Sequence, residues 1–279
     1  MKQLLLPLLV ILAVGCDQQP AGEPVTRTRI DGQEGPATPA PDPSATVTSQ
    51  VESACRSVIF ENTPLTHCLA IPARHTIDTA LAGSDGANYR SLQALSGGRD
   101  AGTIAFAMNG GMFDDAGDPI GYFVEDSERL HALNTADGEG NFHMNPNGVF
   151  YGTGESWEIR TTDDFLAHVT DRPEFGTQSG PMLVIDGKLH PEITQDGPSR
   201  YVRNAVGIDD RGRAHFVISN APISFGKLAR FYRDELKTPN ALYLDGNVSA
   251  LWNPATDRLD SGAPLGPLIV VTKRATATE

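Results

Sequence analysis

The chain has 279 residues, of which 39% are hydrophobic, enough for the core of one large domain or two small ones. Lysine and arginine total 22 and aspartate and glutamate total 35, so the net charge is −13. Such a chain offers no basic patch to neutralise a nucleic-acid backbone, and we expect no nucleic-acid partner. One or two arginines are still sufficient to bind a single phosphate.

The first 15 residues have the features of a bacterial lipoprotein signal peptide. Lys2 precedes an apolar run over residues 4–14, which is too short to cross a bilayer as a helix of about 20 residues. Small residues end this run directly before Cys16. We therefore expect cleavage after residue 15 and lipidation of Cys16, with the protein anchored to a membrane of the cell envelope, in the periplasm or on the cell surface. An ordinary secretory signal or a buried segment is the alternative.

Residues 16–51 are rich in Pro, Ala, Thr and Asp and have almost no large apolar side chains. Because such a segment buries too little surface to offset its ordering entropy, we expect a flexible tether. The folded domain should then cover residues 52–274, followed by a short tail over residues 275–279.

Two further cysteines, Cys55 and Cys68, fall near the start of the expected domain. An exported chain meets an oxidising compartment, which favours a disulfide between them. The apolar residues that separate them could form a hairpin that brings the two thiols together. Free buried thiols are the alternative.

In chain order, apolar and β-branched runs bounded by turn residues predict strands. These are residues 55–60, 66–71, 103–108, 120–124, 148–151, 157–159, 182–185, 206–208, 215–219, 241–244 and 268–271. Helical spacing predicts helices over residues 89–95, 164–169 and 224–236, the last capped by Ser224. Strands outnumber helices, and turns join several of them. We therefore expect a single α+β domain with a mixed, largely antiparallel β-sheet flanked by a few helices.

Four strand-and-turn segments carry the candidate binding and catalytic groups. In the first two, Asn109 precedes Gly110 and Gly111, and Ser179 precedes Gly180. Paired glycines can expose backbone N–H groups, which are donors for an oxyanion or a phosphate. An ordinary structural turn explains either segment when it is taken alone.

The other two segments contain charged groups. Arg203 offers a planar fork for a phosphate or carboxylate. Asp245 stands at the end of an apolar strand, followed by Gly246 and Ser249, and offers an acid or a nucleophile. A strand that ends in an Asp-Gly turn is the structural alternative.

Taken in this order, the segments resemble the phosphodiester glycosidase family, and most closely a bacterial lipoprotein branch of it. The resemblance covers the whole expected domain and is carried by residues 106–113, 121–125, 133–151, 177–187, 203–207 and 243–249. It departs from the sugar-uncovering members at Asn247 and Val248, where those members have a glycine-rich run. Asn109, Asp245 and Ser249 match the motif positions of the family.

The resemblance implies hydrolysis of a sugar-1-phosphodiester in envelope or extracellular glycans, with a glycan or sugar phosphate as the partner. We expect Arg203 to bind the phosphodiester and the Gly110 and Gly111 amides to help hold its oxygens or a sugar hydroxyl. Asp245 would act as acid, base or nucleophile, with Glu125 as the second carboxylate. The rival hypothesis is a non-catalytic glycan-binding or envelope-scaffolding lipoprotein with the same fold.

His143 lies in a polar stretch that could face a sugar, and its ordinary pKa near neutrality suits proton transfer. A surface histidine is the alternative. We expect no cofactor and no metal, because the histidines lack zinc-ligand spacing and the aspartates after residue 113 lack a full calcium loop. No sequence pattern indicates an oligomeric state.

Overall fold

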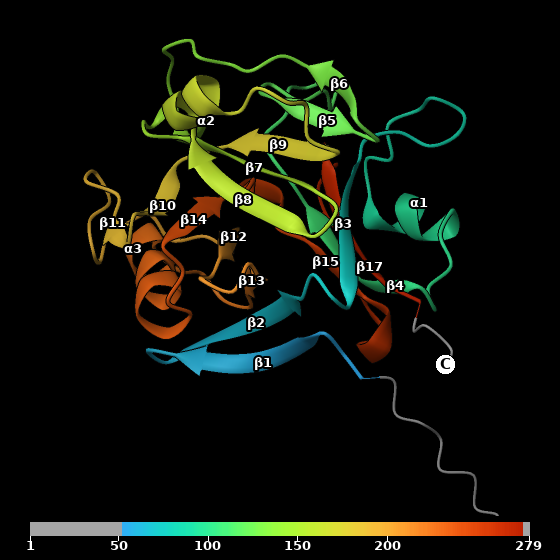
Figure 1. Cartoon of the computed structure of the whole chain (residues 1–279). Coiled ribbons are helices and arrows are strands. Elements are labelled where there is room, and N and C mark those ends of the chain that lie inside the picture. Colours follow the sequence, from blue (N-terminus) through green and yellow to red (C-terminus); the bar gives the residue numbers. More distant parts are fainter. Residues whose placement is uncertain (1–51, 276–279) are drawn as a thin grey trace, which may run out of the picture. The chain divides into compact units, whose positions relative to one another are not determined.

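Seventeen strands form three sheets in residues 52–275, the part of the chain that this computed structural model describes (Figure 1). All pairings between these strands are antiparallel. The predicted signal peptide, the lipidation site Cys16 and the tether lie outside the described residues, as do residues 276–279. No helix within residues 52–275 has both the length and the apolar character needed to cross a membrane.

The first sheet has seven strands in the order β1-β2-β13-β12-β14-β10-β11. In that order they are Cys55–Phe60, Thr63–Ala70, Ala214–Ser219, Asn204–Ile208, Asn240–Tyr243, Met182–Ile185 and Lys188–Leu189. The predicted hairpin β1–β2 is present, and β10–β11 and β12–β13 form two further hairpins. Cys55 and Cys68 lie directly opposite each other in the first hairpin and form the predicted disulfide.

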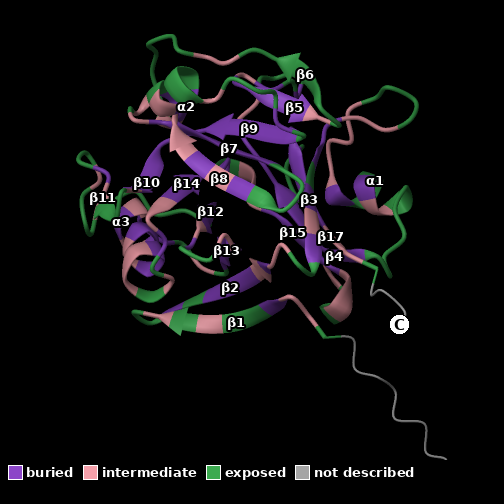
Figure 2. Ribbon diagram, in the orientation of Figure 1, coloured by how far each residue is buried: buried purple, intermediate pink, exposed green. Residues whose placement is uncertain are grey.

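The second sheet has five strands in the order β16-β15-β4-β17-β3. They are Arg258–Leu259, Leu251–Asn253, Ile104–Asn109, Leu268–Lys273 and His75–Ala80. The third sheet has the order β6-β5-β9-β7-β8, with strands Glu128–His131, Phe123–Glu125, Phe175–Ser179, Gly148–Thr153 and Ser156–Thr161. Strands β4 and β9 are buried along their whole lengths, whereas β6 is exposed throughout (Figure 2).

Three phenylalanines, one from each sheet, join the sheets in a common core. Phe216 of β13 packs edge-on against Phe106 of β4, with 5.2 Å between ring centroids, and against Phe150 of β7 at 5.8 Å. All three side chains are fully buried, and burial of each contributes roughly 1.5–3 kcal/mol. Because the rings contact one another across the sheets, they fix the positions of the three sheets relative to one another. The strand ends that carry the candidate site belong to these sheets.

The predicted α+β class with largely antiparallel strands is confirmed, although the strands divide into three sheets. The helices are α1 Leu92–Gly97, α2 Thr162–His168 and α3 Phe225–Arg230, with short 3-10 turns at Asn141–His143, Gly246–Val248 and Pro254–Thr256. The predicted helix over residues 89–95 begins later than expected. Arg90 has φ 54°, outside the right-handed helical region, and Ser91 caps the helix by accepting the Ala94 N–H at 3.1 Å.

Ser224 caps α3 as predicted, by accepting the Lys227 N–H at 3.2 Å. The α-helix ends before the expected residue 236, because Phe231–Glu235 form a π-helical turn. In this turn the fully buried Tyr232 donates its hydroxyl to the Ala205 carbonyl of β12. The helix and this turn thereby pack on one face of the first sheet, against Ala205 of β12 and Ala241 of β14.

Candidate active site

The candidate site lies where β4, β12 and β14 meet at their ends. Asn109 is the last residue of β4, Asn204 is the first of β12, and Asp245 follows β14 by two residues. The Asn204 side-chain amide donates to the side-chain oxygen of Asn109 at 2.9 Å and to its backbone oxygen at 3.1 Å. Since β4 and β12 belong to different sheets, this pair of asparagines joins two sheets at the site.

Asn109 fixes both ends of the turn over residues 245–250. Its side-chain amide donates to the Asp245 backbone oxygen at 2.6 Å, and its side-chain oxygen accepts the Ala250 N–H at 2.9 Å. The residue is fully buried, so its side chain positions the turn from inside the protein. A direct contact between Asn109 and a substrate stays a prediction.

Asp245 is held by backbone contacts on both sides. Its N–H donates to the Gly110 carbonyl at 3.0 Å, and its side chain accepts the Asn247 N–H at 3.2 Å. The residue is only 9% exposed, and this burial raises the pKa of the carboxyl above its usual range. The structure thus presents one carboxyl with increased proton affinity at the end of β14.

Arg203 is the charged residue whose burial most needs an explanation. Its guanidinium donates to the Ile223 carbonyl at 3.0 Å, to the Tyr243 hydroxyl at 3.1 Å and to the Ser199 hydroxyl at 2.9 Å. It also stacks on the Phe225 ring. The residue is 1% exposed, burial lowers the pKa of the guanidinium, and no carboxylate pairs with it among residues 52–275. A buried positive charge therefore remains without a counter-ion at the site.

Tyr243 connects Arg203 to the turn that contains Asp245. Its hydroxyl accepts the Arg203 hydrogen bond, and a Cβ added at Gly246 would clash with that hydroxyl. Burial raises the pKa of Tyr243, while the neighbouring Arg203 charge opposes this effect and the Asp245 charge adds to it. Only glycine at position 246 allows the turn to pass this close to the tyrosine.

The expected role of the Gly110 and Gly111 amides is contradicted. The Gly110 N–H donates to the Pro267 carbonyl at 2.7 Å, and the Gly111 N–H donates to the Thr177 hydroxyl at 3.1 Å. Both donors are therefore already used within the protein. A Cβ at Gly111 would lie 2.3 Å from the Gln178 carbonyl oxygen, so the glycine is required for close packing between β4 and β9.

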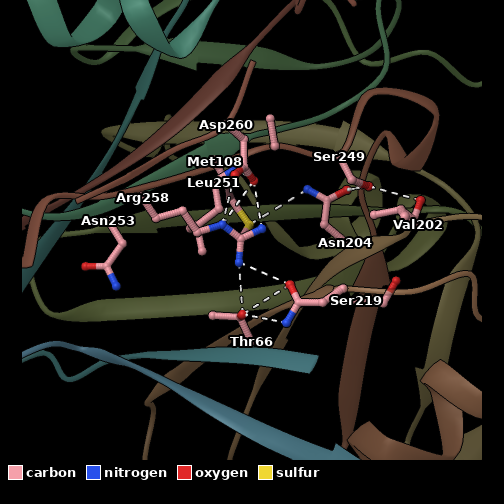
Figure 3. Close-up of polar contacts among 12 residues, drawn as sticks. Thr66, Met108, Val202, Asn204, Ser219, Ser249, Leu251, Asn253, Arg258 and Asp260 are labelled. Atoms are coloured by element: carbon pink, nitrogen blue, oxygen red, sulfur yellow. Dashed lines mark hydrogen bonds and ion pairs between the residues drawn. The ribbon is translucent and has the colours of Figure 1, made fainter. Parts of the chain in front are cut away.

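Ser249 closes the turn after β14. Its hydroxyl lies 3.2 Å from the Asn204 side-chain oxygen and 3.3 Å from the Val202 carbonyl, and Figure 3 shows it between these two residues. Both contacts reach residues next to Arg203. Ser249 thus couples the Asp245 turn to the start of β12.

Ser179 and Gly180 lie in the interior, at the end of β9. Ser179 is fully buried, and its hydroxyl has no hydrogen-bond partner among the described residues. A Cβ at Gly180 would lie 2.7 Å from the Phe142 carbonyl oxygen, so this glycine too serves close packing. No hydrogen bond within residues 52–275 joins either residue to Asp245, and their binding roles stay predictions.

The two other predicted catalytic residues are not brought into contact with Asp245. Glu125 accepts the Leu81 N–H at 3.1 Å, and burial raises its pKa to about 6. His143 places its Nδ1 atom 3.0 Å from the Ala136 carbonyl oxygen. Among the described residues, no hydrogen bond or ion pair links either one to Asp245. Their catalytic roles stay predictions.

A pocket of about 250 Å³ lies against the turn after β14. Its lining includes Gly246 and Ser249 from that turn and Tyr201, two residues before Arg203. Asp245 and Arg203 are not part of the lining. The predicted binding residues Gly246 and Ser249 thus line the pocket. Asp245 and Arg203 are buried, and each is a chain neighbour of a lining residue, Gly246 and Val202.

Sequence reasoning did not single out Tyr243 or Asn204. Tyr243 stands two residues before Asp245, a spacing that places both side chains on one face of an extended chain. Asn204 follows the predicted phosphate ligand Arg203, and an asparagine that opens a buried strand must find hydrogen-bond partners. Within residues 52–275, no group of three or more His, Cys, Asp or Glu side chains is arranged to hold a metal ion.

Comparison with known proteins finds relatives of this chain. It is 36% identical over 170 residues to YigE, an uncharacterized protein of Escherichia coli strain K12. The aligned region covers 61% of this chain and 66% of the length of that protein. The fold is similar to the catalytic domain of a zebrafish N-acetylglucosamine-1-phosphodiester alpha-N-acetylglucosaminidase, described as auto-inhibited by its pro-peptide.

That structural match has a TM-score of 0.54 and 14% sequence identity, and it covers 79% of this chain and 82% of the zebrafish chain. At this identity the likeness concerns the fold alone. Residues 102–272 match the family model described as phosphodiester glycosidase, a region that contains the candidate site from Asn109 to Ser249. The chain belongs to the phosphodiester glycosidase family.

Proposed function

We propose that this protein hydrolyses a sugar-1-phosphodiester of an envelope or extracellular glycan. Water attacks the anomeric carbon, the bond from that carbon to the phosphate oxygen breaks, and the products are a free sugar and a phosphomonoester. Family membership supports a hydrolase of this type. The sugar and the group on the other side of the phosphate are set by the pockets around the site.

The observation that carries this proposal is the buried charge of Arg203. Its hydrogen-bond acceptors are two carbonyls and two hydroxyls, all of them neutral. A buried cation is costly without an anion, and a phosphodiester bound near Tyr243 would supply one. The pKa of Asp245 is raised, the direction opposite to that expected for a carboxylate paired with arginine. The charge of Arg203 is therefore available to stabilise an anionic substrate.

Asp245 is the proposed base that accepts a proton from the attacking water. A carboxyl whose pKa is raised by burial binds that proton more strongly than an exposed carboxyl does. Glu125 is the proposed second carboxylate, because its pKa of about 6 suits proton transfer close to neutrality. With Asp245 as the base, Glu125 acts in its protonated form as the acid that donates to the leaving phosphate oxygen, so Glu125→Gln should remove the alkaline limb of the pH–rate profile near pH 6.

The test is release of free sugar from a panel of sugar-1-phosphodiesters by the purified chain. Asp245→Asn, which keeps the size and one oxygen of the side chain, should lower turnover by at least about 100-fold. Asp171→Asn changes an exposed carboxylate and is the matched control. Full turnover by a folded Asp245→Asn protein would refute the role of Asp245, and no turnover on any member of the panel would refute the proposed reaction.

A non-catalytic glycan-binding protein is the second candidate. It is favoured by one observation, that Asp245 and Arg203 do not line the pocket beside the turn. In this case the chain would bind glycans with measurable affinity and release no sugar. The binding should then be insensitive to Asp245→Asn.

The proposed location is the bacterial cell envelope, with a lipid at Cys16 as the anchor. The proposal rests on the residues that precede Cys16 in the sequence. Expression in a bacterium should place the native chain in the membrane fraction and a Cys16→Ser variant in the soluble exported fraction. Membrane attachment that survives Cys16→Ser would overturn this assignment.

A further inference from the structure

A pocket of about 430 Å³ lies between the β5–β6 hairpin and α2, which neighbour each other in Figure 1. We name it the α2 pocket. Its volume falls within the roughly 300–1,000 Å³ of small-molecule sites. The residues that line it are all different from those that line the pocket beside the Asp245 turn. A ligand of the α2 pocket would therefore occupy a site separate from the candidate active site.

Tyr122 gives the α2 pocket a polar group that the protein itself does not use. The residue is only 6% exposed, and its ring is fixed on two sides. The Phe165 ring of α2 lies 4.9 Å away, and a Cβ at Gly176 of β9 would lie 2.9 Å from the Tyr122 ring. The Tyr122 hydroxyl makes no hydrogen bond within residues 52–275, and it is not among the fully enclosed unpaired atoms of that range. It therefore opens onto the pocket that Tyr122 lines, where it can donate to a ligand.

Two arginines bring positive charge to this hydroxyl. Arg129 stands on β6 opposite Val124 of β5, two residues along the chain from Tyr122. Arg172 follows α2, and its guanidinium donates to the Ser127 carbonyl in the β5–β6 turn at 3.3 Å. Burial raises the pKa of Tyr122, whereas the charges of Arg129 and Arg172 both lower it. Both guanidinium groups therefore lie close enough to act on the hydroxyl, and both line the pocket.

The formal net charge of the α2 pocket is +1, because two arginines and one aspartate, Asp171, line it. Within residues 52–275, neither arginine forms an ion pair with Asp171 or with any other carboxylate. A ligand with a single negative charge balances this set, whereas a dianionic phosphate monoester would leave an excess negative charge beside Asp171. A carboxylate fits well, because it can accept from the planar fork of an arginine and from a phenol at the same time.

The rest of the pocket wall is largely apolar. Leu133 and Val169 are half-buried and pack against the buried cluster that contains Tyr122 and Phe165. Leu166 of α2 also lines the pocket and is 64% exposed. These side chains leave apolar surface that the core of the protein does not cover, and an apolar ligand would remove it from water. The α2 pocket thus matches a ligand in which one carboxylate is joined to an apolar body.

We propose that the α2 pocket binds a small apolar monocarboxylate, such as an alkyl or aryl chain that ends in a carboxylate. Arg129 and Arg172 pair with the carboxylate, and the Tyr122 hydroxyl donates to it. The leucines of the wall contact the apolar body. This binding does not rest on the proposed hydrolysis, since the two pockets share no lining residue.

The test is titration calorimetry of the full chain with octanoate and with 3-phenylpropanoate. Each carboxylate is compared with the alcohol and the phosphate monoester of the same carbon chain, at about pH 8, where the phosphate carries two charges. We expect at least one carboxylate to bind at one site per chain. Its alcohol and its phosphate monoester should each bind at least about 10-fold more weakly, because neither balances the charge of the pocket.

Three variants test the assigned contacts, with circular dichroism as the check on folding. Tyr122→Phe removes only the hydroxyl and should weaken carboxylate binding by about 5-fold or more. Arg129→Gln should weaken it by about 10-fold or more, because a charge-assisted hydrogen bond is lost. Leu166→Ala should weaken it by about 3-fold, because apolar contact is lost. Arg211→Gln changes the charge of an exposed arginine outside the pocket; it is the matched control and should leave binding unchanged.

The inference is overturned if neither carboxylate binds, if the alcohol binds as tightly as its carboxylate, or if Tyr122→Phe and Arg129→Gln bind as tightly as Arg211→Gln. Tighter binding of the phosphate monoester would also overturn it, because the pocket would then select a dianion. Carboxylate binding that depends on Tyr122 in a chain with no sugar release would uphold the pocket and refute the proposed reaction. Sugar release by a chain that binds no carboxylate would do the reverse.

Discussion

The guanidinium carbon of Arg203 lies 3.6 Å from the centroid of the Phe225 ring, in a fully buried position without a carboxylate partner among residues 52–275. This arrangement predicts that loss of the Arg203 charge has a small effect on stability and a large effect on activity. Arg203→Met keeps the length of the side chain and its contact with the ring but removes the charge. The Ile223 carbonyl keeps a second donor, the Tyr201 N–H.

We therefore expect Arg203→Met to change the free energy of unfolding by no more than about 1 kcal/mol, because loss of the uncompensated charge offsets loss of the hydrogen bonds. Turnover of a phosphodiester should fall by at least about 100-fold. Urea unfolding and sugar release measure the two effects. A variant that is strongly destabilised but fully active per folded molecule would show that Arg203 serves the fold and not the substrate.

Asn109→Ala should disconnect the Asp245 turn from β4. It removes the donor to the Asp245 carbonyl and the acceptor for the Ala250 N–H, and it leaves both groups buried. Each unsatisfied buried group costs about 1–3 kcal/mol, so we expect a loss of about 2–6 kcal/mol in the free energy of unfolding for the two groups. Asn88→Ala, which removes one exposed hydrogen bond to Asp118, is the control and should cost less than about 1 kcal/mol. Equal losses in the two variants would contradict the role given to Asn109.

Gly111→Ala should be strongly destabilising because the added Cβ would meet the Gln178 backbone at 2.3 Å. Overpacking against a backbone atom costs about 1–3 kcal/mol or more. Gly97→Ala is the matched control, since a Cβ there has open space and alanine favours the helical state of α1. Thermal unfolding should give a lower Tm for the first variant and an unchanged or higher Tm for the second. A tolerated Gly111→Ala would show that β4 and β9 can move apart.

The stability of the domain should fall as the pH drops below 6.5. His67 Nε2 lies 3.0 Å from His215 Nδ1, and His215 Nε2 lies 3.1 Å from Asp209. Burial, with the charges of His215, Arg56 and Arg213, lowers the pKa of His67 from 6.5 to about 3. Between these values the unfolded chain binds a proton that the folded protein does not, so His67 favours unfolding increasingly as the pH falls through that window. Above pH 6.5 it has no effect.

His67 alone should cost about 2 kcal/mol of stability between pH 7.5 and pH 5. Glu125 acts in the opposite direction. Its pKa is raised to about 6 in the folded protein, so as the pH falls the folded protein binds this proton at a higher pH than the unfolded chain does. The contribution of His67 is therefore isolated by comparison with His67→Gln, whose stability loss over the same range should be smaller by about 2 kcal/mol. Urea unfolding at the two pH values measures both slopes. Identical slopes would mean that His67 is protonated in the folded state.

The strands that are best predicted from the sequence are buried strands made almost entirely of apolar residues. The run that forms β4 and the run that forms β10 are recognised because nearly every side chain is apolar. Strand β9 is not predicted, because its sequence contains the buried polar residues Gln178 and Ser179. Gln178 is satisfied by Asn134 and by the Tyr122 N–H, which are distant in the chain. Strands β3 and β15 are missed in the same way.

The candidate site shows the same limit. Asp245 and Arg203 are found because a charged residue at a strand end is visible in the sequence. Tyr243 is not, because its role depends on a contact with a residue 40 positions earlier. The Gly110 and Gly111 amides are assigned wrongly, since a sequence does not reveal which N–H groups already have acceptors.

Part of the wall of the pocket beside the Asp245 turn is formed by a loop, whereas the proposed catalytic residue Asp245 stands at the end of a strand. Asp245 is held by Asn109, which bonds to Asn204 across two sheets, whereas residues 260–263 of the pocket wall lie outside any strand. Asp260 accepts the Leu251 N–H of β15, whereas replacement of residues 261–263 removes no hydrogen bond that the structure shows. Under the proposed function, exchange of residues 261–263 between relatives would therefore change what the pocket accepts and leave the Asp245 turn in place.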